Sequence, residues 1–169
     1  MGSVPKRSDS TEGTYLVNAR IVVSVVAGAL AVATTLVGAS PAQAAASKIH
    51  IVKVRFDSAG KDLPVTNAKL NDEYVVIKNT DSTTRTLTNW TLRDESHHVY
   101  TFPTTTLKAG ASLKVRTGSG DDTSKNKYQD RGYYVWNNTS DTAYLRNTSG
   151  GGGDTCSWKT SDPGSTKTC

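Results

Sequence analysis

The chain has 169 residues, a formal net charge of +5 and two cysteines. This length suits one domain of ordinary size. Basic and acidic residues are interspersed, and no run of five or more like charges occurs, which excludes a charged interaction tail. A strong nucleic-acid interface normally needs a basic stripe or cluster, and none is visible in the linear sequence.

Residues 1–44 are predicted to form a cleaved signal-peptide helix. Three basic residues precede an apolar run over residues 21–38, and the small residues Ala42 and Ala44 follow in an A-x-A arrangement that predicts cleavage after Ala44. The alternative is an uncleaved anchor, since a run of about 18 residues is borderline for spanning a membrane. The absence of a basic stop-transfer cluster favours cleavage. The only membrane contact expected is therefore through the signal peptide.

The predicted mature part, residues 45–169, is one secreted, monomeric domain. It keeps a charge of +4, because three basic and two acidic residues leave with the signal. Cys156 and Cys169 are expected to pair, since exported proteins meet oxidising conditions. The pair would close a loop of about 14 residues and stabilise the fold by roughly 3 kcal/mol. Zinc is the alternative, but these two cysteines lack the further ligands that it requires.

Short segments rich in Val, Ile, Thr, Tyr and Trp follow, separated by turn residues, and no long amphipathic helix pattern occurs. The expected strands are 48–56, 73–79, 85–94, 98–103, 112–118, 133–138, 142–147 and 154–159. Eight strands at this spacing predict an antiparallel β-sandwich or barrel, and an all-β fold class.

Alternation along these segments predicts which side chains face the core. In the first strand Val52, Val54 and Phe56 share the inward face, with Lys53 and Arg55 on the other. The strand over 73–79 places Val75 and Ile77 inward, and the strand over 112–118 places Leu113 and Val115 inward. In the strand over 85–94 the apolar period slips between Leu87 and Trp90, which predicts a β-bulge near Asn89.

The ordered series "LNDEYVVIKNT", "NWTLRD", "YTFP", "LKAGASLKVRTGSG", "VWNNTSDTAYLRN" and "DTCSW" resembles the lamin tail domain, more narrowly its secreted bacterial versions. The resemblance covers roughly residues 48–158 and implies an immunoglobulin-like antiparallel β-sandwich that acts as a non-catalytic interaction module. The cysteine pair and the tail after Trp158 depart from the family pattern, and we interpret them as a clamp on the last strands.

The resemblance and the strand pattern together define a set of core and family-motif positions. They are Glu73, Val75, Ile77, Trp90, Leu92, Asp94, Phe102, Leu113, Val115, Gly118, Gly120, Trp136, Asn138, Asp141, Ala143 and Leu145. Trp90 is expected between the two sheets, where an aromatic side chain buries about 150–250 Å². Glu73 is expected either to accept hydrogen bonds from buried amides or to pair with Arg93 or Arg116.

Two polar segments have a structural and a functional interpretation. In "NNTSD", Asp141 is expected to accept hydrogen bonds from the amides of a turn. The alternative is a calcium corner, but calcium needs six to eight oxygens and only one carboxylate is local. Near Asp94, the adjacent His97 and His98 are interpreted as a solvated turn, with a weak surface metal site as the alternative.

The candidate binding loop comprises Ser119, Asp121, Asp122, Lys125 and Lys127, because rigid scaffolds usually present function on loops. Its glycines do not make a phosphate loop, since no Lys-Ser/Thr and no helix pattern follow them. No catalytic residue, metal-ligand set or cofactor is predicted. The alternative is a small exported hydrolase or nuclease that uses Asp121 and Asp122 with a divalent ion.

The leading functional hypothesis is a secreted, non-catalytic binding module whose partner is an unknown macromolecule. The candidates are a cell-surface polymer, an exported protein and extracellular nucleic acid, the last bound only weakly because no basic cluster is visible. Self-association through the strand 48–56 is a further alternative. Lys53 and Arg55 argue against it, because charges on an edge strand discourage pairing.

Overall fold

The computed structural model describes residues 48–169, so the predicted signal peptide and its cleavage residues Ala42 and Ala44 lie outside the described residues. The described part contains one helix, α1 (Asn67–Asp72), among short strands. The strands are β1 (Ile49–Arg55), β2 (Tyr74–Asn79), β3 (Arg85–Thr86), β4 (Thr91–Arg93), β5 (Val99–Thr101), β6 (Thr106–Leu107), β7 (Ser112–Arg116), β8 (Asn126–Tyr128), β9 (Asp141–Arg146), β10 (Asp154–Trp158) and β11 (Thr166–Thr168).

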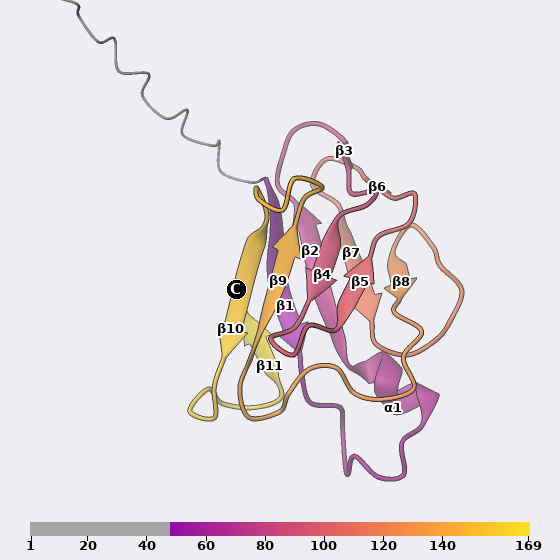
Figure 1. The fold of residues 1–169 in the computed structure, drawn as a ribbon, viewed down its shortest axis with the longest axis vertical. Helices are drawn as coiled ribbons and strands as arrows, with labels where there is room; N and C mark the ends of the chain where they lie inside the picture. The colour runs from indigo at the N-terminus through magenta and orange to yellow at the C-terminus, as the bar shows by residue number, and fades with distance from the viewer. Residues whose placement is uncertain (1–47) are drawn as a thin grey trace, which may run out of the picture. The chain divides into compact units, whose positions relative to one another are not determined.

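The strands form two facing sheets and a small two-stranded ribbon (Figure 1). The order is β11-β1-β2-β7-β8 in the larger sheet, β10-β9-β4-β5 in the smaller one, and β3-β6 in the ribbon. Pairing is antiparallel except between β7 and β8, which run parallel. The predicted all-β, immunoglobulin-like sandwich is confirmed.

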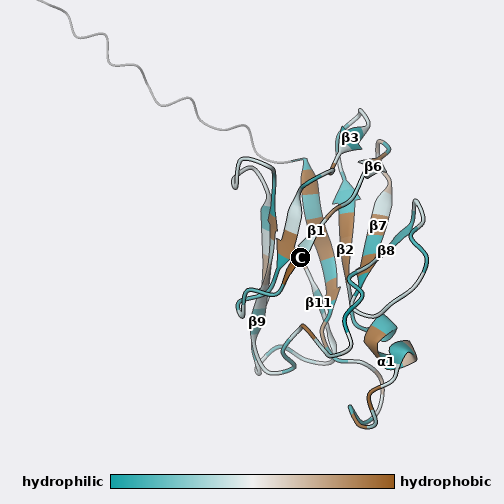
Figure 2. Ribbon diagram, turned by 45° about the vertical axis from the view of Figure 1, so that its right-hand side comes forward, coloured by the Kyte–Doolittle hydropathy of each residue, from teal (hydrophilic) through white to brown (hydrophobic). Residues whose placement is uncertain are grey.

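Apolar and polar bands alternate along β1, β2 and β7 (Figure 2), as expected when one face of a sheet packs on a core. Val75, Ile77, Leu113 and Val115 are buried, as predicted. The core that the two sheets share consists of Ile49, Ile51, Val54, Phe56, Val75, Ile77, Leu87, Leu92, Tyr100, Phe102, Leu107, Leu113, Val115, Val135, Trp136, Ala143, Leu145, Cys156 and Trp158. Trp90 is a correction, because it is only partly buried and packs against this core from its margin.

The inward face of β1 was predicted wrongly at Val52. The pairing of β1 with β2 shifts register between Ile51 and Lys53, so one strand contains an extra residue at this point. Ile49 and Ile51 are buried before the bulge, Val54 is buried after it, and Val52 lies half-exposed between them.

The bulge predicts different tolerance at two neighbouring valines. Val52→Thr should change the free energy of unfolding by less than about 0.5 kcal/mol, because its side chain is half-exposed. Val54→Thr should cost roughly 1–3 kcal/mol, because it places a hydroxyl at a fully buried position. Urea unfolding of both variants tests this, and equal losses would contradict the register.

The segment 85–94 is two strands rather than one bulged strand. β3 belongs to the ribbon and β4 to the four-stranded sheet, and a turn joins them. Asn89 in this turn has φ 64°, in the left-handed region that asparagine tolerates better than most residues. The slip in the apolar period near Asn89 therefore marks the place where the chain changes sheets.

Three further expectations need correction. Residues 133–138 form no strand, although Val135 and Trp136 are buried. The candidate binding loop runs into the short strand β8, which the strand pattern did not predict. The strand proposed as an edge for self-association, β1, is an interior strand between β11 and β2.

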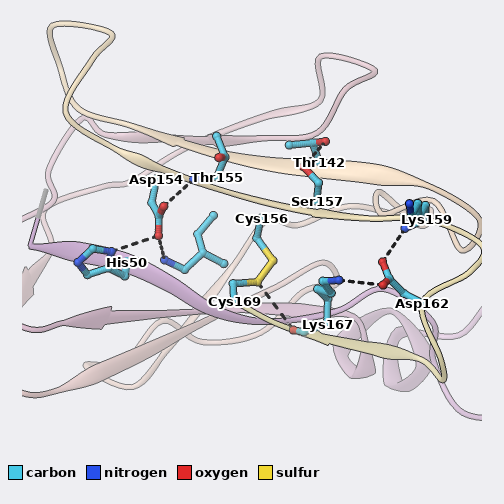
Figure 3. The surroundings of a disulfide bond; sticks show 11 residues. His50, Thr142, Asp154, Thr155, Cys156, Ser157, Lys159, Asp162, Lys167 and Cys169 are labelled. Carbon is cyan, nitrogen blue, oxygen red and sulfur yellow. Dashed lines mark hydrogen bonds and ion pairs between the residues drawn. A yellow bond between two sulfur atoms is a disulfide. The ribbon is translucent and has the colours of Figure 1, made fainter. Parts of the chain in front are cut away.

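A disulfide joins Cys156 of β10 to Cys169, which follows β11, with their Cα atoms 5.9 Å apart (Figure 3). It therefore links the four-stranded sheet to an edge of the five-stranded sheet. Beside it, Lys167 and Asp162 form an ion pair at 2.9 Å. A structural disulfide is typical of proteins in oxidising compartments.

Candidate functional site

The predicted carboxylates have structural partners. Glu73 is fully buried at the end of α1, and its two oxygens accept from the backbone N–H groups of Val135 (3.1 Å) and Trp136 (2.7 Å). Of the two alternatives for Glu73, the structure shows buried amides rather than an arginine. Burial raises the pKa of Glu73 to about 7, while the Thr117 side chain and the two amides act in the opposite direction.

Asp141 fills the corner that the "NNTSD" pattern indicated. Its carboxylate accepts from the N–H groups of Glu95 (3.0 Å), Asn137 (3.0 Å) and Thr142 (2.7 Å). Burial raises the pKa of Asp141. Because turn amides occupy this carboxylate, the calcium interpretation has little support from the geometry.

The neighbouring turn is held by Asp94. Its buried carboxylate accepts from the His98 N–H at 2.7 Å and lies 2.6 Å from the His98 Nδ1. His97 is exposed and has φ 68°. Within residues 48–169, no group of three or more His, Cys, Asp or Glu side chains is placed to hold a metal ion.

Trp136 and Asn138 separate in the structure. Trp136 is buried against the edge of Trp158, with ring centroids 6.0 Å apart, and Trp158 donates from Nε1 to the Asn137 carbonyl at 2.8 Å. Asn138 was grouped with the core positions, but its side chain is exposed and lies 3.4 Å from Asp57. Residues 136–138 therefore belong to the scaffold rather than to a reaction centre.

The candidate binding loop is only partly free. Lys127 is 8% exposed and bonds to Asp122 at 3.0 Å, and Asp122 also accepts from the Tyr128 N–H. The prediction that Lys127 belongs to the binding surface is therefore wrong, since its ammonium group pairs with Asp122 within the loop and is not free for a partner. Ser119 is anchored through its N–H and carbonyl to Asn67. Asp121 and Lys125 remain exposed.

A side chain at either family-motif glycine of this loop would crowd a neighbouring side chain. A Cβ on Gly118 would lie 2.5 Å from the side-chain oxygen of Asn67, and one on Gly120 would lie 2.6 Å from the Tyr128 ring. The two glycines thus allow the loop backbone to pack closely against α1 and β8.

The sheet also brings together cations that are distant in the sequence. Register places Lys53, Val76 and Lys114 in one row across β1, β2 and β7, and Arg55, Tyr74 and Arg116 in the next row. All face outward, since the residues between them are buried. We call the outward cations Lys53, Arg55, Lys78, Lys114 and Arg116, with Lys108 and Lys125 beside them, the basic face.

A pocket of about 610 Å³ adjoins the basic face where the 119–127 loop meets β6 and β7. Val76 and Ala111 contribute to its lining, together with the basic residues Lys108, Lys114 and Lys125. Burial and the like charges of neighbouring cations, Arg116 first, lower the pKa of Lys114, whereas Asp72 acts in the opposite direction. An anion bound beside Lys114 would therefore favour its charged form.

The basic face is not visible in the linear sequence. Its lysines and arginines look scattered there, because their separation along the chain is large. Two segments did contain a signal, since "KVR" occurs in both β1 and β7 with cations on alternate residues. In a strand such residues share one face. Knowing that β2 lies between β1 and β7 is what turns two pairs into a cluster.

Two facing sheets around a shared apolar core define an immunoglobulin-like scaffold. Its buried carboxylates Glu73, Asp94 and Asp141 accept hydrogen bonds from backbone N–H groups. The family model described as Lamin Tail Domain matches residues 42–160. The chain therefore belongs to the lamin tail domain family, whose members are generally non-catalytic interaction modules. No curated protein matches the chain. Within residues 48–169, no helix has the length and apolar character needed to cross a membrane.

Proposed function

We propose that this protein is a secreted, monomeric binding module that holds a macromolecular partner on its basic face. The carrying observation is the alignment of Lys53 and Lys114 in one row across three strands, with Lys125 at the adjoining pocket. Rigid strands hold these charges in place, so a partner need not order them on binding. The family relationship and the disulfide support a non-catalytic, extracellular role.

The metal-dependent hydrolase has no specific support from the geometry. Asp122 bonds to Lys127 and to the Tyr128 N–H, so its carboxylate would have to leave both to bind a cation. Self-association by strand pairing is likewise disfavoured. The edge strands β5, β8 and β11 have three residues each and the edge strand β10 has five, and short edges offer little template for pairing.

A matched pair of variants tests this proposal. The face variant, Lys53→Ala with Lys125→Ala, removes two exposed cations of the basic face; the control variant, Lys61→Ala with Lys159→Ala, removes two exposed cations elsewhere. We expect the parent and the control to retain the same partner from culture medium and cell envelope. The face variant should retain it roughly tenfold less well, because each lost ion pair weakens association. Equal retention by all three proteins would refute the proposal.

A further inference from the structure

The basic face is a regular array of positive charge. Neighbouring strands lie about 4.8 Å apart, and alternate residues along a strand lie about 6.7 Å apart. Lys53 and Lys114 are two strands apart in one row, and Lys78 lies on the intervening strand β2 in the adjacent row, opposite His50 and Ser112. Such an array matches a partner that carries negative charges at short, repeated intervals, rather than a single small anion.

The lysines and arginines of the basic face are engaged differently. Arg55 is paired with Asp72 at 2.9 Å, and Arg116 donates to the Asn71 carbonyl and to the Asn126 side chain. By contrast, the ammonium groups of Lys53, Lys78, Lys108 and Lys125 make no hydrogen bond or ion pair with any of residues 48–169, and all four side chains are exposed. The charge available to a partner is therefore carried mainly by lysine.

This distinction bears on the chemistry of the partner. The planar fork of arginine matches both carboxylates and phosphates, but both arginines here are already engaged. Lysine acts as a point charge and approaches phosphate oxygens from many directions. A lysine array with occupied arginines therefore binds through point charges, which suit repeated phosphate groups.

The aromatic side chains of the basic face argue against base recognition. The Lys114 ammonium lies 4.0 Å from the centroid of the Tyr74 ring, and the Arg116 guanidinium lies 5.8 Å from the same centroid. The Tyr128 ring packs against the backbone of Gly120. Single-stranded nucleic-acid sites generally need aromatic rings that are free to stack on bases. Neither ring offers such a platform.

We infer that the basic face docks a flexible, base-free phosphodiester polymer, a chain of repeated polyol phosphates. This inference rests on the proposed function and adds the chemistry of the partner. Successive phosphates lie along the lysines from Lys53 through Lys114 to Lys125. The apolar floor of the adjoining pocket, which includes Val76 and Ala111, takes a carbon segment between two phosphates.

The test uses three probes of equal charge number: a poly(glycerol phosphate), an oligothymidylate and a poly-glutamate. Binding of each to protein produced from the full sequence is measured between 50 and 200 mM salt. We expect the polyol phosphate to bind at least tenfold more tightly than the other two. If about four phosphates are neutralised, its affinity should fall roughly 50-fold over this salt range.

The variants locate the site. The face variant should bind the polyol phosphate at least tenfold more weakly and with a shallower salt dependence, while the control variant binds as the parent does. Tighter or equal binding of oligothymidylate or poly-glutamate would overturn the inference, as would equal losses in both variants. If the face variant loses the natural partner but neither the parent nor either variant binds the polyol phosphate, the inference fails and the proposed function stands.

Discussion

Replacing Glu73 with alanine is expected to lower the free energy of unfolding by roughly 2–6 kcal/mol, because two buried amides lose their acceptor. These are the N–H groups of Val135 and Trp136, in a segment that no strand pairing holds. Loss of the carboxylate should therefore release residues 133–138 first. Urea unfolding measures the loss, and hydrogen exchange at the two amides shows where it arises.

The matched control is Glu95→Ala. Glu95 is exposed, and its side chain accepts one hydrogen bond from the Thr142 hydroxyl at 2.7 Å. Its removal should cost less than about 1 kcal/mol. Equal losses in the two variants would show that the amides of Val135 and Trp136 do not depend on Glu73.

The same residue should make stability depend on pH. Burial raises the pKa of Glu73 from its ordinary value of 4.5 to about 7, so the folded chain holds this proton more tightly than the unfolded chain. Its contribution to stability is therefore fully present below pH 4.5 and is lost as the pH rises through 7. The loss amounts to about 3 kcal/mol by pH 8.

Glu73→Gln separates this titration from other pH effects. The charged group that acts on Glu73 is Asp141, whose own pKa is raised by burial and which is present in both the parent and the variant. The glutamine variant should be less stable than the parent at pH 5 but should lack the additional decline between pH 5 and 8. Parallel stability–pH curves for parent and variant would rule out a raised pKa at Glu73.

The alternation of apolar and polar residues predicted many of the buried positions. The choice of pairing strand, which the sequence does not show, limited the prediction elsewhere. Val75 and Ile77 could be assigned inward because the opposite face of β2, with Tyr74 and Val76, also carries the charged Lys78. In β1 both Ile51 and Val52 are apolar, so the sequence allows two registers, and only the pairing with β2 selects one. Trp136 followed a strand-like pattern, yet its amide bonds to a side chain from a distant segment.

The site was harder to predict because it depends on strand order. The pattern "KVR" in β1 and β7 indicates outward cations, but their addition into one surface requires β2 to lie between them. Exposure in the loop also depended on tertiary contacts. Lys127 and Lys125 have the same chemistry and are two residues apart, but β8 buries the first and leaves the second exposed.

Removing the disulfide with Cys156→Ala and Cys169→Ala should lower the free energy of unfolding by about 3 kcal/mol, the loop-closure entropy of a cross-link over this short distance. The two cysteines are 13 residues apart. The loss should be large for this chain because β11 makes only three pairs with β1, between Lys53 and Arg55 on one side and Thr166 and Thr168 on the other. Without the cross-link, few contacts keep this edge strand on the sheet.

Reduction of the parent provides the control, because it breaks the same bond without changing either side chain. Reductant should lower the stability of the parent by about the same amount and leave the double variant unchanged. Since β11 pairs with Lys53 and Arg55, its release exposes an edge of β1 next to the basic face. A loss below about 1 kcal/mol in both experiments would mean that the strand pairing of β11, rather than the cross-link, holds the end of the chain on the sandwich.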